Sequence, residues 1–135
     1  MAKLEFNPDE SVFVDQWRFM LQGKRIKFPI LSRCVLTDQR FIYFDLGKAV
    51  PLYVQMGFLI RFFVKGKPVS MPLNGLVLSR GKYAMNKKIL SVATSDGTEA
   101  LLDSYEKSLE WFQNVLAEYG LSMYEIGEDE WMVQA

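Results

Sequence analysis

The chain has 135 residues, half of them apolar, with ten Phe, six Tyr and three Trp, which suffices for the core of one domain but not of two. Its formal charge is zero, yet residues 23–90 hold thirteen Lys and Arg against two Asp, a local excess of +11. The absence of His and the presence of one cysteine, Cys34, exclude an internal disulfide and, in practice, a structural zinc site. The basic segment 23–90 therefore binds an anionic partner, lies under the acidic C-terminal tail, or carries its charges on a different edge of the sheet from the acids.

The N-terminal part of the chain predicts strands. Residues 11–21 fit a strand because they are rich in β-branched and aromatic side chains, although their apolar spacing also fits one face of a helix. Residues 31–36 and 41–46 place apolar side chains on both faces of a hairpin, so we expect both faces to be covered. Cys34 falls within this hairpin, and we interpret it as a core residue in preference to a reactive thiol.

Residues 50–64 form an apolar segment that is interrupted by Gln55 and Arg61. Its fifteen residues are too few for a membrane-spanning helix, which needs ~20. Three interpretations remain open: an insertion packed on the core, a contact with another protein or a second copy, and an interfacial membrane contact. The aromatic side chains available for such a contact are Tyr53, Phe58, Phe62 and Phe63.

The segment 71–116 carries the clearest local signals. Short strands on either side of Asn74-Gly75 are followed by two more, at 88–94 and 98–103, which meet at the hairpin turn Ser95-Asp96-Gly97. The complete set of predicted strands is 12–20, 31–37, 40–46, 69–73, 76–83, 88–94 and 98–103.

One amphipathic helix is predicted to close this β-structure. We expect its N-cap at Asp103, with Glu106 as the capping-box partner, and its end at Gly120. Its apolar face follows from spacings of three and four between Tyr105, Leu109, Phe112, Leu116 and Tyr119. We therefore divide the chain into a domain at 1–120 and an acidic-aromatic tail at 121–135.

Two runs of residues agree in order and spacing with a known family. The first is VLTDQRFIYF at 35–44, and the second is the run at 71–102 with its Met-Pro-Leu, Gly-Lys and Asp-Gly elements. Together they resemble the bacterial PH-like and GRAM-like domains, whose closing helix often carries a tryptophan where Trp111 stands. The resemblance covers residues 31–117, although Asn74-Gly75-Leu76 departs from the usual pattern and the acidic tail lies outside it. It implies a mainly β fold: a bent antiparallel seven-stranded barrel capped by a C-terminal helix, with an apolar insertion at about 50–65.

Catalysis finds little support in these residues. Without His the commonest general base and metal ligand is missing, and no phosphate-binding glycine motif is complete. We predict no catalytic residue, no cofactor and no metal site. The expected function is a non-enzymatic binding or adaptor role, with a protein partner or a second copy of the chain as ligand.

The alternative is peripheral binding to anionic membrane lipid headgroups, because the first loop of PH-like domains that bind inositol phosphates supplies cations. The candidate cations are Lys24, Arg25, Lys27 and Arg33, with a second cluster at Lys82, Lys87 and Lys88. Nucleic acid is disfavoured because the net charge is zero and no stacking motif is present. The charged N-terminus does not resemble a signal peptide, so we expect a cytoplasmic protein, either free or peripheral at the inner face of the membrane.

Overall fold

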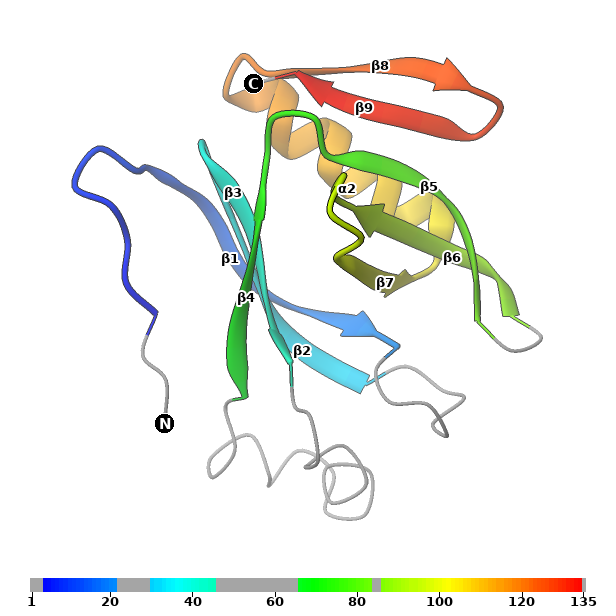
Figure 1. Ribbon diagram of the computed structural model, residues 1–135, viewed down its shortest axis with the longest axis horizontal. Coiled ribbons are helices and arrows are strands. Elements are labelled where there is room, and N and C mark those ends of the chain that lie inside the picture. Colours follow the sequence, from blue (N-terminus) through cyan, green and yellow to red (C-terminus); the bar gives the residue numbers. More distant parts are fainter. Residues whose placement is uncertain (1–3, 22–29, 46–65, 84–85, 135) are drawn as a thin grey trace.

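The computed structural model describes residues 4–21, 30–45, 66–83 and 86–134. In chain order its elements are β1 (Val12–Met20), β2 (Ile30–Thr37), β3 (Arg40–Asp45), β4 (Lys67–Pro72), β5 (Val77–Tyr83), β6 (Asn86–Ala93), β7 (Glu99–Asp103), α2 (Tyr105–Glu118), β8 (Ser122–Gly127) and β9 (Glu130–Gln134). The described strands form one antiparallel sheet in the order β4-β3-β2-β1-β7-β6-β5-β9-β8 (Figure 1). The fold is mainly β, as predicted, and residues 11–21 contribute a strand.

The sheet bends where β1 meets β7. These two strands share the register pair Met20 and Leu102, and the Leu21 amide donates to the Leu101 carbonyl at 2.9 Å. By contrast, β1 pairs with β2 along its whole length. The short junction lets the β1–β4 half and the β5–β7 half splay apart, as Figure 1 shows, with α2 beside the second half.

The core lies between the two halves and under α2. Its fully buried side chains come from both halves of the sheet and from the helix, and the largest include Phe41, Phe112, Met20, Leu36, Met71 and Leu78. The Phe112 ring of α2 meets the Phe41 ring of β3 edge-on, with 5.3 Å between centroids. The helix thus closes the open end of the bent sheet.

Both faces of the β2–β3 hairpin are covered, as its apolar pattern predicts. Cys34, Leu36 and Phe41 belong to the main core, whereas Val35, Ile42 and Phe44 form a second buried cluster against which Leu4 packs. Cys34 is fully buried, and loss of solvation raises the pKa of its thiol to about 12. The prediction of a core cysteine is confirmed.

The predicted helix cap is wrong. Asp103 is the last residue of β7, where it pairs with Ile89, and this ladder keeps it from acting as the cap. The N-cap position is Ser104, with φ 62° and no side-chain cap bond, while the Ser108 hydroxyl donates to the Asp103 carbonyl at 2.7 Å. The helix ends before Gly120, whose φ of 79° is the left-handed conformation expected there.

The C-terminal residues form a β-hairpin where the sequence analysis expected a tail. β8 and β9 bring the described sheet to nine strands, two more than the seven predicted. Val133 is buried, and Met123 and Trp131 pack against the main core. The described sheet is not closed into a barrel, because β4 and β8 are its two separate edges.

Candidate functional site

Most of the predicted contact residues lie outside the part of the chain that the structure describes. These are the first-loop cations Lys24, Arg25 and Lys27 and the aromatic residues Tyr53, Phe58, Phe62 and Phe63. Lys82 belongs to β5 and Lys87 to β6, but their side chains are also outside the description. Arg33 and Lys88 are the two predicted cations whose side chains are described.

Arg33 is engaged within the sheet. Its Nε and Nη2 donate to the two carboxylate oxygens of Asp15 on the neighbouring strand, at 2.9 and 2.6 Å. Its guanidinium also lies 5.1 Å from the centre of the Phe44 ring, and the Asp15 carboxylate raises the pKa of Arg33. Arg33 therefore stabilises the β1–β2 pair, and it lies in the other half of the sheet from Lys88.

Lys88 lines a pocket at the start of α2. The pocket has a volume of about 230 Å³ and is lined by Arg80, Lys88, Ser104, Tyr105 and Glu106. The Arg80 guanidinium lies 4.2 Å from the centre of the Tyr105 ring. Two cations beside the positive end of a helix dipole favour an anion, while Glu106 at the same place opposes one.

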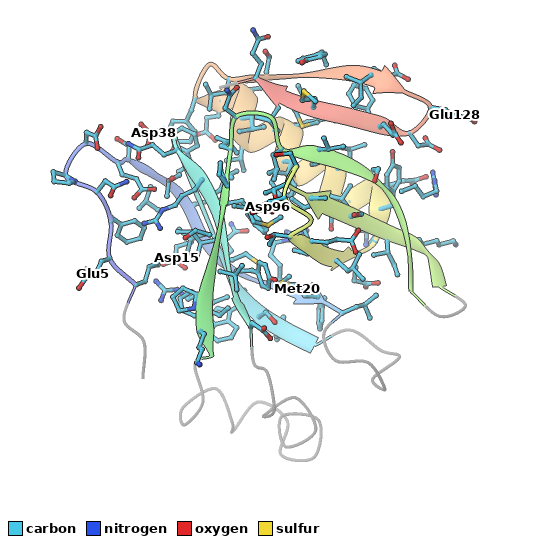
Figure 2. All side chains as sticks on the ribbon, in the orientation of Figure 1. Glu5, Asp15, Met20, Asp38, Asp96 and Glu128 are labelled. Carbon is cyan, nitrogen blue, oxygen red and sulfur yellow. The ribbon has the colours of Figure 1, made fainter. Side chains whose placement is uncertain are left out.

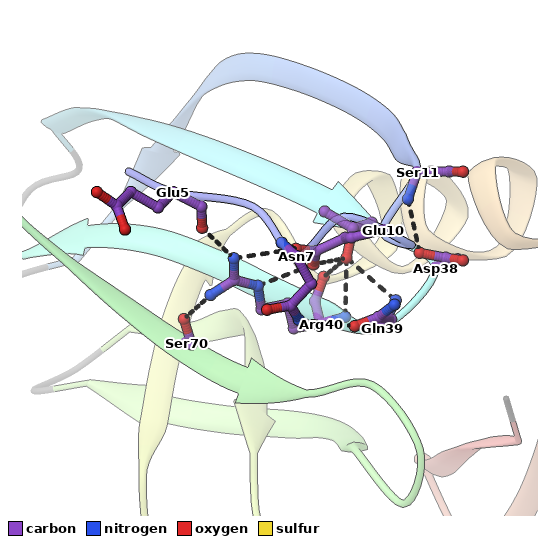
Figure 3. A network of polar contacts seen from close by, with 9 residues as sticks. Glu5, Asn7, Glu10, Ser11, Asp38, Gln39, Arg40 and Ser70 are labelled. Atoms are coloured by element: carbon purple, nitrogen blue, oxygen red, sulfur yellow. Dashed lines mark hydrogen bonds and ion pairs between the residues drawn. The ribbon is translucent and has the colours of Figure 1, made fainter. Parts of the chain in front are cut away.

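The polar residues in the middle of the VLTDQRFIYF run form a network of hydrogen bonds, in which Figure 3 labels Asp38, Gln39 and Arg40. Thr37 Oγ1 accepts hydrogen bonds from the amides of Gln39 and Arg40, each at 3.0 Å, and donates to Glu10 at 2.6 Å. Asp38 accepts a hydrogen bond from the Ser11 amide at 2.9 Å. These residues therefore shape the β2–β3 turn and hold the segment that precedes β1.

Arg40 is the centre of a set of polar contacts, the N-terminal clamp, which joins Arg40 to Glu5, Glu10, Thr37 and Ser70. Its Nε and Nη2 donate to the Glu10 carboxylate at 2.8 and 3.0 Å, and its other donors reach Ser70 Oγ at 2.8 Å and the Glu5 carbonyl at 2.6 Å. The bonds from Arg40, followed by those from Thr37 and Asn7, lower the pKa of Glu10 to about 2. The polar groups of the clamp form their hydrogen bonds within the chain, so its role is to stabilise the fold.

The C-terminal hairpin brings exposed apolar and acidic side chains together. Tyr124 and Ile126 of β8 are 46% and 43% exposed. Residues 108–135 hold six acids and no Lys or Arg, and Glu128 lies at the hairpin tip away from the helix (Figure 2). Asp129 in the hairpin turn forms an exposed ion pair with Arg80 of β5 at 3.3 Å.

A second pocket lies where the hairpin meets the turn between β4 and β5. Its volume is about 480 Å³, and it is lined by Asn74, Gly75, Tyr124, Met132, Val133 and Gln134. The Gly75 amide donates to the Val133 carbonyl at 2.9 Å, so the turn and the hairpin form one surface. Sequence reasoning missed this surface, although the alternation of apolar residues after Gly120 was a signal for strands.

The two edges of the described sheet differ in composition. β4 begins Lys67-Pro68 and ends at Pro72, residues that natural sheets use to prevent another strand from pairing. β8 has the sequence SMYEIG, which contains neither Pro nor Lys. A bulge interrupts the pairing of β8 with β9 between Glu125 and Gly127, so the part of the described edges that remains open to regular pairing is residues 122–125 of β8.

Two aromatic residues of β1 are also exposed. Trp17 and Phe19 lie on the outer face of β1, opposite Arg33 and Leu31 of β2. The chain that follows, residues 22–29, is outside the described part. No helix in the described part is long and apolar enough to cross a bilayer.

Comparison with known proteins found no family model that matches the chain and no curated protein with a matching sequence.

Proposed function

We propose that this chain is a PH-like, non-enzymatic module that binds another protein through its C-terminal hairpin. The PH-like assignment rests on the VLTDQRFIYF and 71–102 runs, and the strand order β4-β3-β2-β1-β7-β6-β5 with a helix after β7 is compatible with it. The proposed barrel would comprise these seven strands, with the hairpin as an addition to β5. Because a fold does not fix a function, the function is argued from the hairpin alone.

One observation carries the proposal: the edge at β8 combines exposed Tyr124 and Ile126 with acidic neighbours, and its regular part before the bulge at Glu125/Gly127 contains no Pro or Lys. Exposed apolar residues rimmed by charged ones are typical of protein-binding surfaces. The hairpin is also held to the rest of the sheet, since Val133 is buried and its backbone bonds to Gly75 and Leu76. A partner would therefore meet a preformed surface and lose little affinity to ordering it.

Site-specific photocrosslinking in the cell of origin tests this function. A benzophenone amino acid replaces Tyr124 in one variant and Phe6, which is 41% exposed, in the control. We expect a discrete covalent adduct with another protein from position 124 and none of comparable yield from position 6. Equal yields from the two positions, or no adduct from position 124, would contradict the proposal.

A second candidate function is binding of anionic lipid headgroups, and the pocket of Arg80 and Lys88 at the start of α2 favours it. A basic residue near an anionic surface contributes about 1 kcal/mol, so loss of two would reduce liposome binding roughly 30-fold. The test is sedimentation with phosphatidylserine liposomes of the Arg80→Gln/Lys88→Gln protein and of a Lys107→Gln control. Equal binding by the double variant and the control would remove this pocket from consideration.

A further inference from the structure

The backbone of β9 shows which groups of the hairpin are already paired. The Val133 amide donates to the Leu76 carbonyl at 2.9 Å, and the Val133 carbonyl accepts from the Gly75 amide at 2.9 Å. The backbone of Val133 therefore faces the β5 side. Because successive residues of a strand direct their backbone groups to opposite sides, Met132 faces β8, where its register partner is Tyr124.

The same alternation identifies the open groups of β8. If Tyr124 is paired with β9, its neighbours Met123 and Glu125 direct their amides and carbonyls toward the outer side of the strand. No described strand lies on that side. The edge thus offers two amides and two carbonyls at the spacing that an added strand requires.

The side chains of β8 specify what such a strand would carry. Glu125 shares a face with its register partner Trp131, whereas Tyr124 shares the other face with Met132. A residue directly opposite Glu125 in an added strand would lie on the face of Glu125, where a cation is favoured. A residue directly opposite Tyr124 would lie on the face of Tyr124, where an aromatic or β-branched side chain is favoured.

We propose that the edge of β8 takes up an extended segment of another protein in which Lys or Arg alternates with apolar residues. This inference rests on the proposed function and adds the binding mode and the chemistry of the partner. The segment pairs with Met123 and Glu125 as a tenth strand, and Glu128 and Glu130 next to the edge attract its cations.

A second copy of the chain fits this edge less well than a basic segment does. β8 contains no cation that could lie opposite Glu125 of a second copy, and the register that pairs Glu125 with Glu125 is disfavoured because like charges repel across strands. The other described edge, β4, carries Pro68 and Pro72, which cannot donate to a ladder. Charge complementarity therefore selects a basic partner strand.

The test uses the full-length protein and two peptides of identical composition and charge. One is the capped hexapeptide Val-Lys-Val-Lys-Val-Lys, and the control is the capped block peptide Lys-Lys-Lys-Val-Val-Val. Binding is followed by NMR titration at millimolar peptide, together with hydrogen exchange of individual amides. We expect the alternating peptide to slow exchange at Met123 and Glu125 about tenfold or more and to leave Tyr124 unchanged, because the Tyr124 amide is already bonded.

Three variants separate the contribution of the outward amide, the contribution of the Glu125 charge, and the effect of damage to the fold. Glu125→Pro removes an outward amide without breaking a bond to β9 and should lower affinity for the alternating peptide roughly five- to tenfold. Glu125→Gln removes only the charge and should lower affinity by a factor of about two to five. Tyr124→Pro breaks the β8–β9 ladder, and the fall in its midpoint of thermal unfolding is the reference for damage to the fold.

Equal affinity for the two peptides, or binding without protection of Met123 and Glu125, overturns strand addition. So does a dimer in sedimentation velocity that forms without peptide and is abolished by Glu125→Pro, because the edge would then serve a second copy. If position 124 still yields a crosslinked protein in any of these cases, the proposed protein-binding function survives and only its binding mode fails.

Discussion

Removing the negative charge of Glu10 should destabilise the protein by about 2 kcal/mol at neutral pH, through loss of the N-terminal clamp. The Glu10 side chain has no exposed area, and it accepts hydrogen bonds from Arg40, Thr37 and the Asn7 amide. A pKa lowered from 4.5 to about 2 corresponds to at most about 3 kcal/mol. Because a fifth of the Arg40 side chain is exposed, solvent screening reduces this to about 2 kcal/mol.

The pH dependence has a definite sign. The folded-state pKa of Glu10 lies below its unfolded value, so the stabilisation is fully present above the unfolded pKa of 4.5 and is lost as the pH falls towards about 2. Urea unfolding of wild type and Glu10→Gln between pH 7 and pH 2 should therefore give a difference that is largest near neutrality. The Asp15→Asn variant is the control, since the exposed Arg33 pair contributes about 0.5 kcal/mol. A smaller loss for Glu10→Gln than for Asp15→Asn, or a difference independent of pH, would refute the reasoning.

Three further predictions concern the core and one turn. Phe112→Ala should lower the free energy of unfolding in urea by about 3–5 kcal/mol, because the ring is fully buried against Phe41; a loss of less than about 1 kcal/mol would contradict its place in the core. Iodoacetamide at pH 8 should leave Cys34 unmodified until urea is added, since burial raises the pKa of its thiol to about 12; rapid alkylation of the folded protein would count against this. Gly97→Ala should cost about 1 kcal/mol in thermal unfolding, because φ is +94° although the added methyl meets nothing; unchanged stability would oppose this.

The strands and the helix were readable from the sequence because they depend on local patterns. The alternation at 31–36 and 41–45, the Asp96-Gly97 turn and the Gly120 stop each act over a few residues, and all appear in the structure. The helix cap failed because pairing of Asp103 with Ile89 of β6 decided its conformation. The pairing of Asp103 with Ile89 joins residues that are far apart in the sequence, so the local capping pattern around Asp103 could not predict it.

The candidate site was less predictable than the fold. The count of charges indicated the basic residues as candidates. In the structure Arg33 forms an ion pair with Asp15, and Lys88 lies beside the start of α2. The open edge at β8 could not be predicted, because an edge is defined by which strands meet elsewhere in the sheet. Its exposed Tyr124 looked like an anchor for a tail until the pairing with β9 was known.

The central claim is that the C-terminal hairpin is the surface that meets another protein. Its most direct test is the yield of covalent protein adducts from a photocrosslinker at position 124, measured against the yield from position 6. We predict one dominant adduct from position 124 and a background smear from position 6. The same adducts at equal yield from both positions, or none from position 124, would contradict the claim.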